Sequence, residues 1–271
     1  MRRLGMGIMA AAMCVGLTAA SQPSSLSNAD RQALAKAVAS PARSDTNRAR
    51  DRYRNPAATL AFFGVRPRDT VVELVPGGGW YSEIIAPYVI NGGGTYYAAA
   101  ADRGLNGFRA LSAKQPAPFA KARLANFPVR TASDVKVPDG SADVVLTFRN
   151  VHNWAMGEQP YASEAFRQIY AMLKPGGVLG IEEHRLPESA DSAREKSSGY
   201  LKVSTVRRLA EQAGFRYAGS SEVNANKRDT ADHPEGVWTL PPTLRLGDKD
   251  KAKYLAIGES DRMTLKFVKP R

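Results

Sequence analysis

The segment Val71–Tyr81, VVELVPGGGWY, carries the strongest structural signal in this chain. Its first half is a short, mostly β-branched apolar run, which is typical of a buried parallel strand, and Pro76 ends that run. The three glycines that follow let the backbone turn tightly and approach a ligand without a Cβ in the way. Apolar residues then recur at i and i+4 over residues 80–89, which predicts a helix ended by the Asn-Gly-Gly-Gly of residues 91–94. We expect Pro87 to kink or shorten the last turn of that helix.

The next segment completes a βαβ unit. Residues 95–101 are predicted to form a second strand, and Asp102 stands at its end. An acidic residue at this distance from the glycines can accept hydrogen bonds from ribose hydroxyls, although it can equally cap the end of a strand. Ligands of such sheets bind outside the carboxyl ends of the strands.

Strands and helices continue to alternate along the rest of the chain. Apolar periodicity predicts helices that begin near Pro160 and Ser204, and the first of them is closed by the Lys-Pro-Gly-Gly of residues 174–177. A helix behind a Ser27 or Asn28 cap and another that ends at Gly64 precede the first strand. Further strands are predicted at residues 123–130, 144–146, 178–181, 215–223 and 263–268.

With its glycine turn and its Lys-Pro-Gly-Gly, residues 48–271 of this chain resemble the class I S-adenosylmethionine-dependent methyltransferase superfamily. More narrowly, they resemble a bacterial group of exported predicted methyltransferases. The resemblance implies an α/β, Rossmann-like fold, with a seven-stranded, mostly parallel sheet, an antiparallel last strand and helices on both faces. S-adenosyl-L-methionine is the implied cofactor. The residues implied to bind it are Glu73, Gly77, Gly78, Gly79, Asp102 at the ribose and Asp134 at the adenine amino group.

The glycine turn departs from the family pattern, because Val75 stands where its first glycine is expected and Pro76 stiffens the turn. Three functions therefore stay open. The chain is a methyltransferase that acts on a small molecule or an envelope component, an inactive relative kept as a binding protein, or a nicotinamide-dependent enzyme. The last is disfavoured because the glycines are contiguous rather than spaced as Gly-x-Gly-x-x-Gly.

The loop after the fourth strand contains Asn150, His152 and Trp154, and it is expected at the carboxyl edge of the sheet. A neutral histidine can remove a proton from a methyl acceptor near neutral pH, so His152 is the candidate base. Trp154 would offer the acceptor a flat wall, and Asn150 would add polar contacts. The alternative is that Trp154 packs under the following helix and His152 bonds to the backbone.

Metal binding is conceivable but not predicted. All three histidines, His152, His184 and His233, are expected at the same edge of the sheet, where Glu183 or Asp232 could complete a nitrogen and oxygen ligand set. However, no pair of them has the spacing of ligands on one helix.

Two segments are expected to cover the site. Residues 224–261 form a long insertion between the last two strands, and Trp238 gives it an apolar anchor, so we predict a packed lid over the carboxyl edge. Residues 21–47 are predicted to be a leader or lid. In the arginine run that follows, either all side chains are solvated, or Arg52 or Arg54 pairs with the carboxylate of the cofactor or with an acidic substrate.

Residues 1–20 read as a secretory signal peptide, since Arg2 and Arg3 precede a short apolar stretch that ends in small residues. We therefore expect a periplasmic or secreted protein. Cys14 is the single cysteine, so cleavage would leave a mature chain without disulfides. The formal net charge of +12 favours weak contact with anionic surfaces, whereas no specific nucleic acid partner is indicated.

Overall fold

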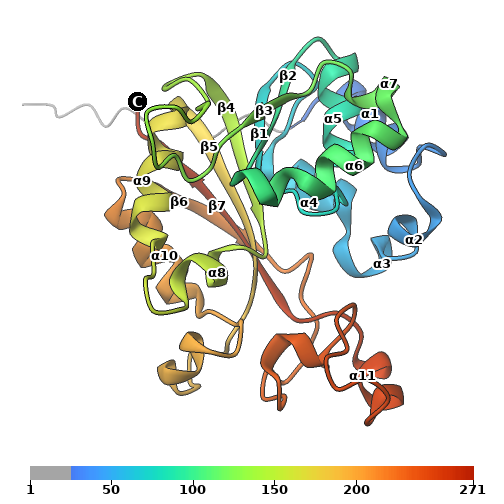
Figure 1. Ribbon diagram of the computed structural model, residues 1–271, viewed down its shortest axis with the longest axis vertical. Helices are drawn as coiled ribbons and strands as arrows, with labels where there is room; N and C mark the ends of the chain where they lie inside the picture. Colours follow the sequence, from blue (N-terminus) through green and yellow to red (C-terminus); the bar gives the residue numbers. More distant parts are fainter. Residues whose placement is uncertain (1–25) are drawn as a thin grey trace, which may run out of the picture.

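The computed structural model describes residues 26–271, so the predicted signal peptide lies outside the described part of the chain. A seven-stranded sheet runs through the centre, and helices cover both of its faces (Figure 1). The strand order is β3-β2-β1-β4-β5-β7-β6, in which β7 is antiparallel to both neighbours and all other pairs are parallel. This arrangement confirms the predicted Rossmann-like sheet. Within residues 26–271, no helix has the length and apolar character needed to cross a membrane.

The strands lie close to their predicted positions. They are β1 (Thr70–Leu74), β2 (Thr95–Ala99), β3 (Arg123–Ala125), β4 (Ala142–Phe148), β5 (Leu173–His184), β6 (Arg216–Ser221) and β7 (Arg262–Val268). The chain order reverses between β1 and β4, which are neighbours in the sheet, and a ligand crevice is expected outside the carboxyl ends of these two strands.

The helices fall into two layers. One face of the sheet is covered by α1 (Asn28–Val38), α4 (Pro56–Phe63), α5 (Ser82–Asn91) and α6 (Asn106–Lys114), and the other by α8 (Val151–Ala155), α9 (Ala162–Met172) and α10 (Val203–Gln212). Shorter helices are α2 (Asp45–Arg48), α3 (Asp51–Arg54), α7 (Pro116–Phe119) and α11 (Lys251–Ile257). Successive side chains of β1 pack against opposite helix layers. Val71 packs on the α5 side of the sheet and Val72 on the α9 side.

Helix α5 ends at Asn91, as predicted from the Asn-Gly-Gly-Gly of residues 91–94, so Pro87 does not shorten it. A proline removes a single backbone donor, and the final turn is held by Gly92 and Gly94, whose N–H groups both donate to the carbonyl of Val89. The Lys-Pro-Gly-Gly of residues 174–177 also differs from expectation, because α9 already ends at Met172 and these residues form the start of β5.

The segment before β1 begins with α1, whose N-terminus is capped by Ser27, as predicted. Helix α1 packs against α4 and α5, where Leu34 is buried, and so lies on the outside of that layer. The chain then passes through α2 and α3 to the carboxyl edge of the sheet.

Residues 224–261 leave from the carboxyl edge, because β6, like β5, is antiparallel to β7. They form the orange-to-red lobe below the sheet in Figure 1. The buried carboxylate of Asp229 organises this insertion. It accepts hydrogen bonds from the Tyr200 hydroxyl and from the backbone N–H groups of Ala231 and Asp261, and the Nε2 atom of His233 lies 2.8 Å from its Oδ1. The insertion is therefore a packed structure, as predicted.

A buried ion pair joins β5 to β7. Arg262 and Glu182 are 1% and 0% exposed, and their Nη1 and Oε1 atoms are 2.7 Å apart. The other carboxylate oxygen accepts the Tyr81 hydroxyl at 2.8 Å, and Arg262 also donates to the carbonyl of Tyr53 at 2.6 Å. The pair thus connects two strands to the residue before α5 and to α3.

We expect Arg262→Met to lower the free energy of unfolding by about 3 to 5 kcal/mol, because it leaves the Glu182 carboxylate buried without its cation. Urea unfolding followed by circular dichroism measures this loss. Adding Glu182→Gln to the same chain removes the stranded charge and should recover much of the stability. An unchanged urea midpoint in Arg262→Met would contradict the assignment.

Candidate active site

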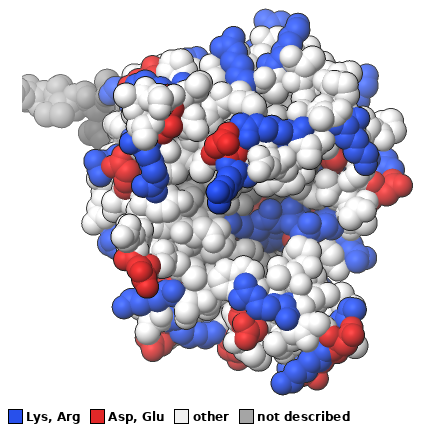
Figure 2. Space-filling model, in the orientation of Figure 1, with Lys and Arg blue, Asp and Glu red and all other residues white. Residues whose placement is uncertain are grey.

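A cavity of about 430 Å³ opens at the carboxyl ends of β1, β4 and β5. Its walls come from the glycine turn at residues 75–80, the β4–α8 loop at 148–153, the α2–α3 segment at 47–54 and the insertion at 237–260. Figure 2 shows a hollow across the middle of the molecule, with basic side chains along it. The sheet topology places the ligand crevice here, so this cavity is the candidate site.

The glycine turn serves two purposes. Gly77 and Gly78 line the cavity, and a Cβ added at either would meet no atom within 4 Å, so they leave room for a ligand. Gly79 has a φ of +81°, and a Cβ there would lie 2.3 Å from a methyl group of Leu111. Gly79 is therefore favoured by its left-handed backbone and by the close approach of Leu111 from α6, whereas Gly77 and Gly78 face the site.

Two residues on the cavity wall adopt a backbone conformation that favours glycine. Val75 has a φ of +50° and Arg149 a φ of +61°, and they follow the neighbouring strands β1 and β4. Such strain in a non-glycine residue costs on the order of 1 to 3 kcal/mol and clusters at functional sites. Val75, which stands where the family pattern has a glycine, therefore has a backbone conformation that glycine adopts without strain.

His152 is held by a buried carboxylate. Its Nδ1 lies 2.8 Å from Oε1 of Glu183, and its backbone N–H donates to Oε2 at 3.1 Å. Both residues are buried, at 3% and 0% exposure. Because a carboxylate accepts, Nδ1 carries the proton, and the Nε2 lone pair stays free. This is how a carboxylate orients a histidine that acts as a base.

His184 lies beside His152, with ring centroids 5.2 Å apart. Its Nδ1 is 2.6 Å from the hydroxyl oxygen of Ser260 in the insertion. Burial lowers the pKa of His184 well below its ordinary value, and His152 and the nearby arginines, Arg149 first, lower it further. His184 is therefore neutral at physiological pH.

Of the residues considered as metal ligands, the structure brings together His152, Glu183 and His184. Their possible ligand atoms lie within 4.8 Å of one another. His233 lies apart, because it bonds to Asp229 in the insertion. The oxygens of Glu183 already accept from the His152 ring and from two backbone N–H groups, and the arginines beside the histidines oppose a cation.

Trp154 does not line the cavity, so the prediction of an aromatic wall at this residue is corrected. It is 1% exposed and packs edge-on between Phe127 and Phe166 of α9, as the alternative interpretation held. Trp238 of the insertion takes the place on the cavity wall, with its ring centroid 6.1 Å from that of His152. Burial of a large apolar ring under the next helix stabilises the core, which explains the difference.

Asn150 borders the cavity, but its amide nitrogen is 3.2 Å from both the carbonyl oxygen of Leu74 and the hydroxyl of Thr147, so it ties β4 to β1.

Asp102 lies outside the cavity, mostly exposed, and pairs with Arg109 at 2.6 Å. Asp134 is half-buried and accepts hydrogen bonds from the backbone N–H groups of Arg130 and Thr131. The structure therefore does not bring these two acidic residues to the cavity.

Glu73 lies behind the turn rather than in the cavity. It is 2% exposed and accepts hydrogen bonds from Tyr96 at 2.6 Å and from Ser82 at 2.8 Å. Burial raises its pKa to about 7, and the two hydroxyl groups and the charge of Arg149 offset only part of that shift. Glu73 thus fixes the start of α5 against β1 and β2.

Of the two alternatives for the arginine run, Arg54 fits a position at the site and Arg52 fits a solvated position. Arg54 lines the cavity, stacks over Trp80 and donates to Glu259 at 3.0 Å, whereas Arg52 is exposed and stacks over Tyr53. Burial, followed by the charge of Arg149, lowers the pKa of Arg54 to about 9. The segment before β1 therefore covers part of the site.

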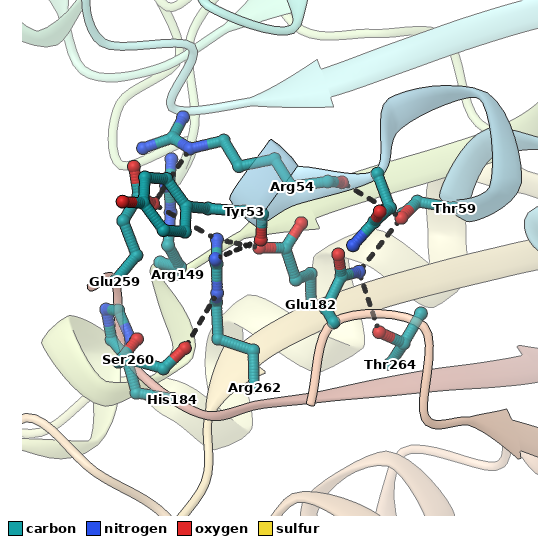
Figure 3. A network of polar contacts seen from close by, with 12 residues as sticks. Tyr53, Arg54, Thr59, Arg149, Glu182, His184, Glu259, Ser260, Arg262 and Thr264 are labelled. Atoms are coloured by element: carbon teal, nitrogen blue, oxygen red, sulfur yellow. Dashed lines mark hydrogen bonds and ion pairs between the residues drawn. The ribbon is translucent and has the colours of Figure 1, made fainter. Parts of the chain in front are cut away.

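Figure 3 shows the guanidinium groups of Arg54, Arg149 and Arg262 around Glu259 and Glu182. Burial alone would raise the pKa of Glu259, but the charges of Arg54 and Arg262 bring it down to about 2. Glu259 is therefore ionised. Arg149 could not be predicted from the sequence, because a single arginine after a strand forms no pattern. Its surroundings are built by segments that are far apart in the chain.

Comparisons with known proteins agree with this architecture. Residues 73–181 match the family model of a methyltransferase domain. No curated protein sequence matches the chain. A structure of an S-adenosylmethionine-dependent methyltransferase from Aquifex aeolicus is 16% identical, covers 89% of this chain and 98% of its own, and has a TM-score of 0.54. This protein has the Rossmann-like methyltransferase fold.

Two further structures with this fold differ in chemistry. Phosphoethanolamine N-methyltransferase 2 of Haemonchus contortus, in complex with S-adenosyl-L-methionine, is 18% identical over 81% of this chain and 53% of its own, with a TM-score of 0.50. The [4+2]-cyclase SpnF is 15% identical over 80% of each chain, with a TM-score of 0.55. The family match covers residues 73–181 and the solved structures show the fold, so activity has to be argued from the site.

The raised pKa of Glu73 predicts an unusual dependence of stability on pH. Because the folded pKa of about 7 lies above the ordinary 4.5, the folded protein holds this proton more tightly than the unfolded chain does. The contribution to stability is therefore present below pH 4.5 and is lost as the pH rises through 7. We expect Glu73→Gln, which cannot ionise, to gain on the order of 3 kcal/mol relative to the native protein between about pH 5 and about pH 8. Urea unfolding at both pH values measures it, and parallel losses in the two proteins would refute it.

Proposed function

We propose that this protein is an S-adenosylmethionine-dependent methyltransferase that acts on a small-molecule or envelope acceptor. It would belong to the exported bacterial group and would work in the periplasm or outside the cell after removal of residues 1–20. The observation that carries the proposal is that an open glycine turn and the buried His152–Glu183 pair face one cavity. The first suits a cofactor and the second suits proton removal.

The residues of the cavity fit the amino-acid end of the cofactor. Gly77 and Gly78 leave space that any Cβ would fill, and Val75 has a left-handed backbone that a glycine would adopt without strain. Arg54, which lines the cavity and stacks over Trp80, supplies positive charge beside the turn for a carboxylate. Asp102, the candidate partner of the ribose, would first have to give up Arg109.

When bound, S-adenosylmethionine would supply a methyl group on a positively charged sulfur. Residues of this chain would then position the acceptor and remove its proton. Glu183 holds the proton of His152 on Nδ1, so Nε2 accepts the proton from the acceptor, and the carboxylate stabilises the imidazolium that forms. Trp238 and the rest of the insertion cover the cavity and limit access of water.

Binding of the cofactor can be tested without knowing the acceptor. We expect the native protein to bind S-adenosylmethionine but not NAD in a calorimetric titration. Gly78→Val should abolish this binding, because its side chain enters the cavity, while the melting temperature changes little, since no protein atom lies within 4 Å of the added Cβ. Asp102→Asn tests the ribose contact in the same titration. Absence of heat in the native protein would refute the proposal and favour the inactive alternative, which the intact His152–Glu183 pair does not support.

The base is tested by kinetics, with the acceptor found by screening for transfer of a labelled methyl group. We expect His152→Ala to lower turnover by roughly 10²- to 10⁴-fold with cofactor affinity nearly unchanged. It should also lower the melting temperature, because the buried Glu183 carboxylate loses the ring that donates to it. The loss of turnover should shrink at high pH, where the acceptor ionises unaided.

His233→Ala is the matched control, because this histidine belongs to the Asp229 network of the insertion. It should cost stability but leave the turnover of the folded molecules intact. Equal turnover of His152→Ala and the native protein at neutral pH would leave positioning alone as the mechanism.

A further inference from the structure

The cavity contains guanidinium groups whose donors are not all paired. Across residues 26–271, the side chain of Arg149 forms no hydrogen bond, and its nearest ion-pair partner is Oε2 of Glu259 at 4.0 Å. The Nη2 atom of Arg50 is buried and has no hydrogen-bond partner either. Both residues line the cavity. A donor left unpaired in a desolvated site costs free energy unless a ligand accepts from it.

Positive charge exceeds negative charge around this cavity. Two carboxylates, Glu182 and Glu259, are shared among the guanidinium groups, and Glu183 is committed to His152. The four arginines of this cluster are Arg50, Arg54, Arg149 and Arg262. The cofactor would worsen the imbalance, because its sulfonium and ammonium groups outnumber its one carboxylate. The missing negative charge is therefore expected on the second ligand.

Arg149 is placed toward that second ligand. It follows β4 and lies three residues before His152, the candidate base, and its charge acts on His184. Its side chain is 22% exposed, and its backbone is held in the left-handed region. Burial lowers the pKa of Arg149 despite Glu182 and Glu259, so the free protein destabilises this charge. An arginine on a cavity wall that has a strained backbone, a destabilised charge and no side-chain hydrogen bond has the features of a ligand-binding group.

We propose that the guanidinium group of Arg149, assisted by Nη2 of Arg50, binds an anionic group of the methyl acceptor. The acceptor is then a small molecule that carries a carboxylate or a similar oxyanion together with the hydroxyl or amine whose proton His152 removes. A carboxylate suits the planar fork of a guanidinium group best. The assignment of the anion to the methyl acceptor rests on the proposed function, whereas the anion-binding site itself does not depend on methyl transfer.

The test uses simple anions and the mature protein. Benzoate, acetate and inorganic phosphate are titrated at high millimolar concentration, with binding followed by calorimetry and by thermal unfolding, and neutral benzamide serves as the isosteric control for benzoate. We expect anions to stabilise the native protein and benzamide not to. Arg149→Gln should weaken anion binding by roughly 10- to 100-fold, the loss expected for a charge-assisted hydrogen bond.

Two variants separate a specific site from general charge. Arg149→Lys keeps the charge and should retain part of the affinity. Arg52→Gln removes a neighbouring but exposed arginine outside the cavity, and it should leave anion binding unchanged. We also expect Arg149→Gln without any ligand to melt no lower than the native protein, because the removed charge is destabilised there.

Repeating the titration with saturating S-adenosylmethionine assigns the anion to a ligand. If Arg149 serves the acceptor, anion binding persists and the affinity of Arg149→Gln for the cofactor is nearly unchanged. If the cofactor displaces the anion and Arg149→Gln loses cofactor affinity, Arg149 holds the carboxylate of the cofactor, and the proposal is overturned. It is equally overturned if no anion shows binding that depends on Arg149. Absence of cofactor binding alone refutes the proposed function and leaves the anion site to be judged from the cofactor-free titrations.

Discussion

The buried ion pair between Glu182 and Arg262 is the constraint on which the rest of the structure depends. Two charges removed from water are tolerated only when their remaining polar atoms are satisfied, and here Tyr81 and the carbonyl of Tyr53 complete the set. These partners come from the start of α5 and from α3. One electrostatic requirement therefore fixes the position of the glycine turn, the N-terminal segment and the antiparallel strand relative to one another.

On the same strand, β5, neighbouring side chains point to opposite faces of the sheet, and one serves stability while the other orients the candidate base. Successive side chains of a strand point to opposite faces, so Glu182 and Glu183 are adjacent in the chain but have different partners. Glu182 meets Arg262 in the network of Figure 3, whereas Glu183 orients the ring of His152. Stability of the sheet and orientation of the candidate base are thus set by neighbouring residues, and a shift of register by one residue would destroy both.

Several residues at the carboxyl edge of the sheet adopt conformations or carry charges that lower the stability of the fold. Val75 and Arg149 are held in left-handed conformations at the ends of adjacent strands, and the arginines of the cavity are desolvated near one another. None of these features improves the packing of the sheet. They persist because the surrounding core and the Asp229 network of the insertion determine the backbone around them. The site is thereby preorganised for a ligand whose charge the protein itself does not supply.

The sequence by itself determined the sheet, its helices and the edge at which the site lies, because the periodicity of apolar residues and the glycine turn are local signals. It also placed His152 near the cavity and residues 224–261 over it. Only the tertiary structure decided which side chains meet. In the structure, Trp154 lies in the core and Trp238 lines the cavity instead, whereas Asp102 and Asp134 lie outside it. The structure also shows that the side chain of Arg149 forms no hydrogen bond and has only a long ion pair with Glu259. These outcomes depend on contacts between residues far apart in the chain, and no local pattern encodes the charge balance of a cavity built from four segments.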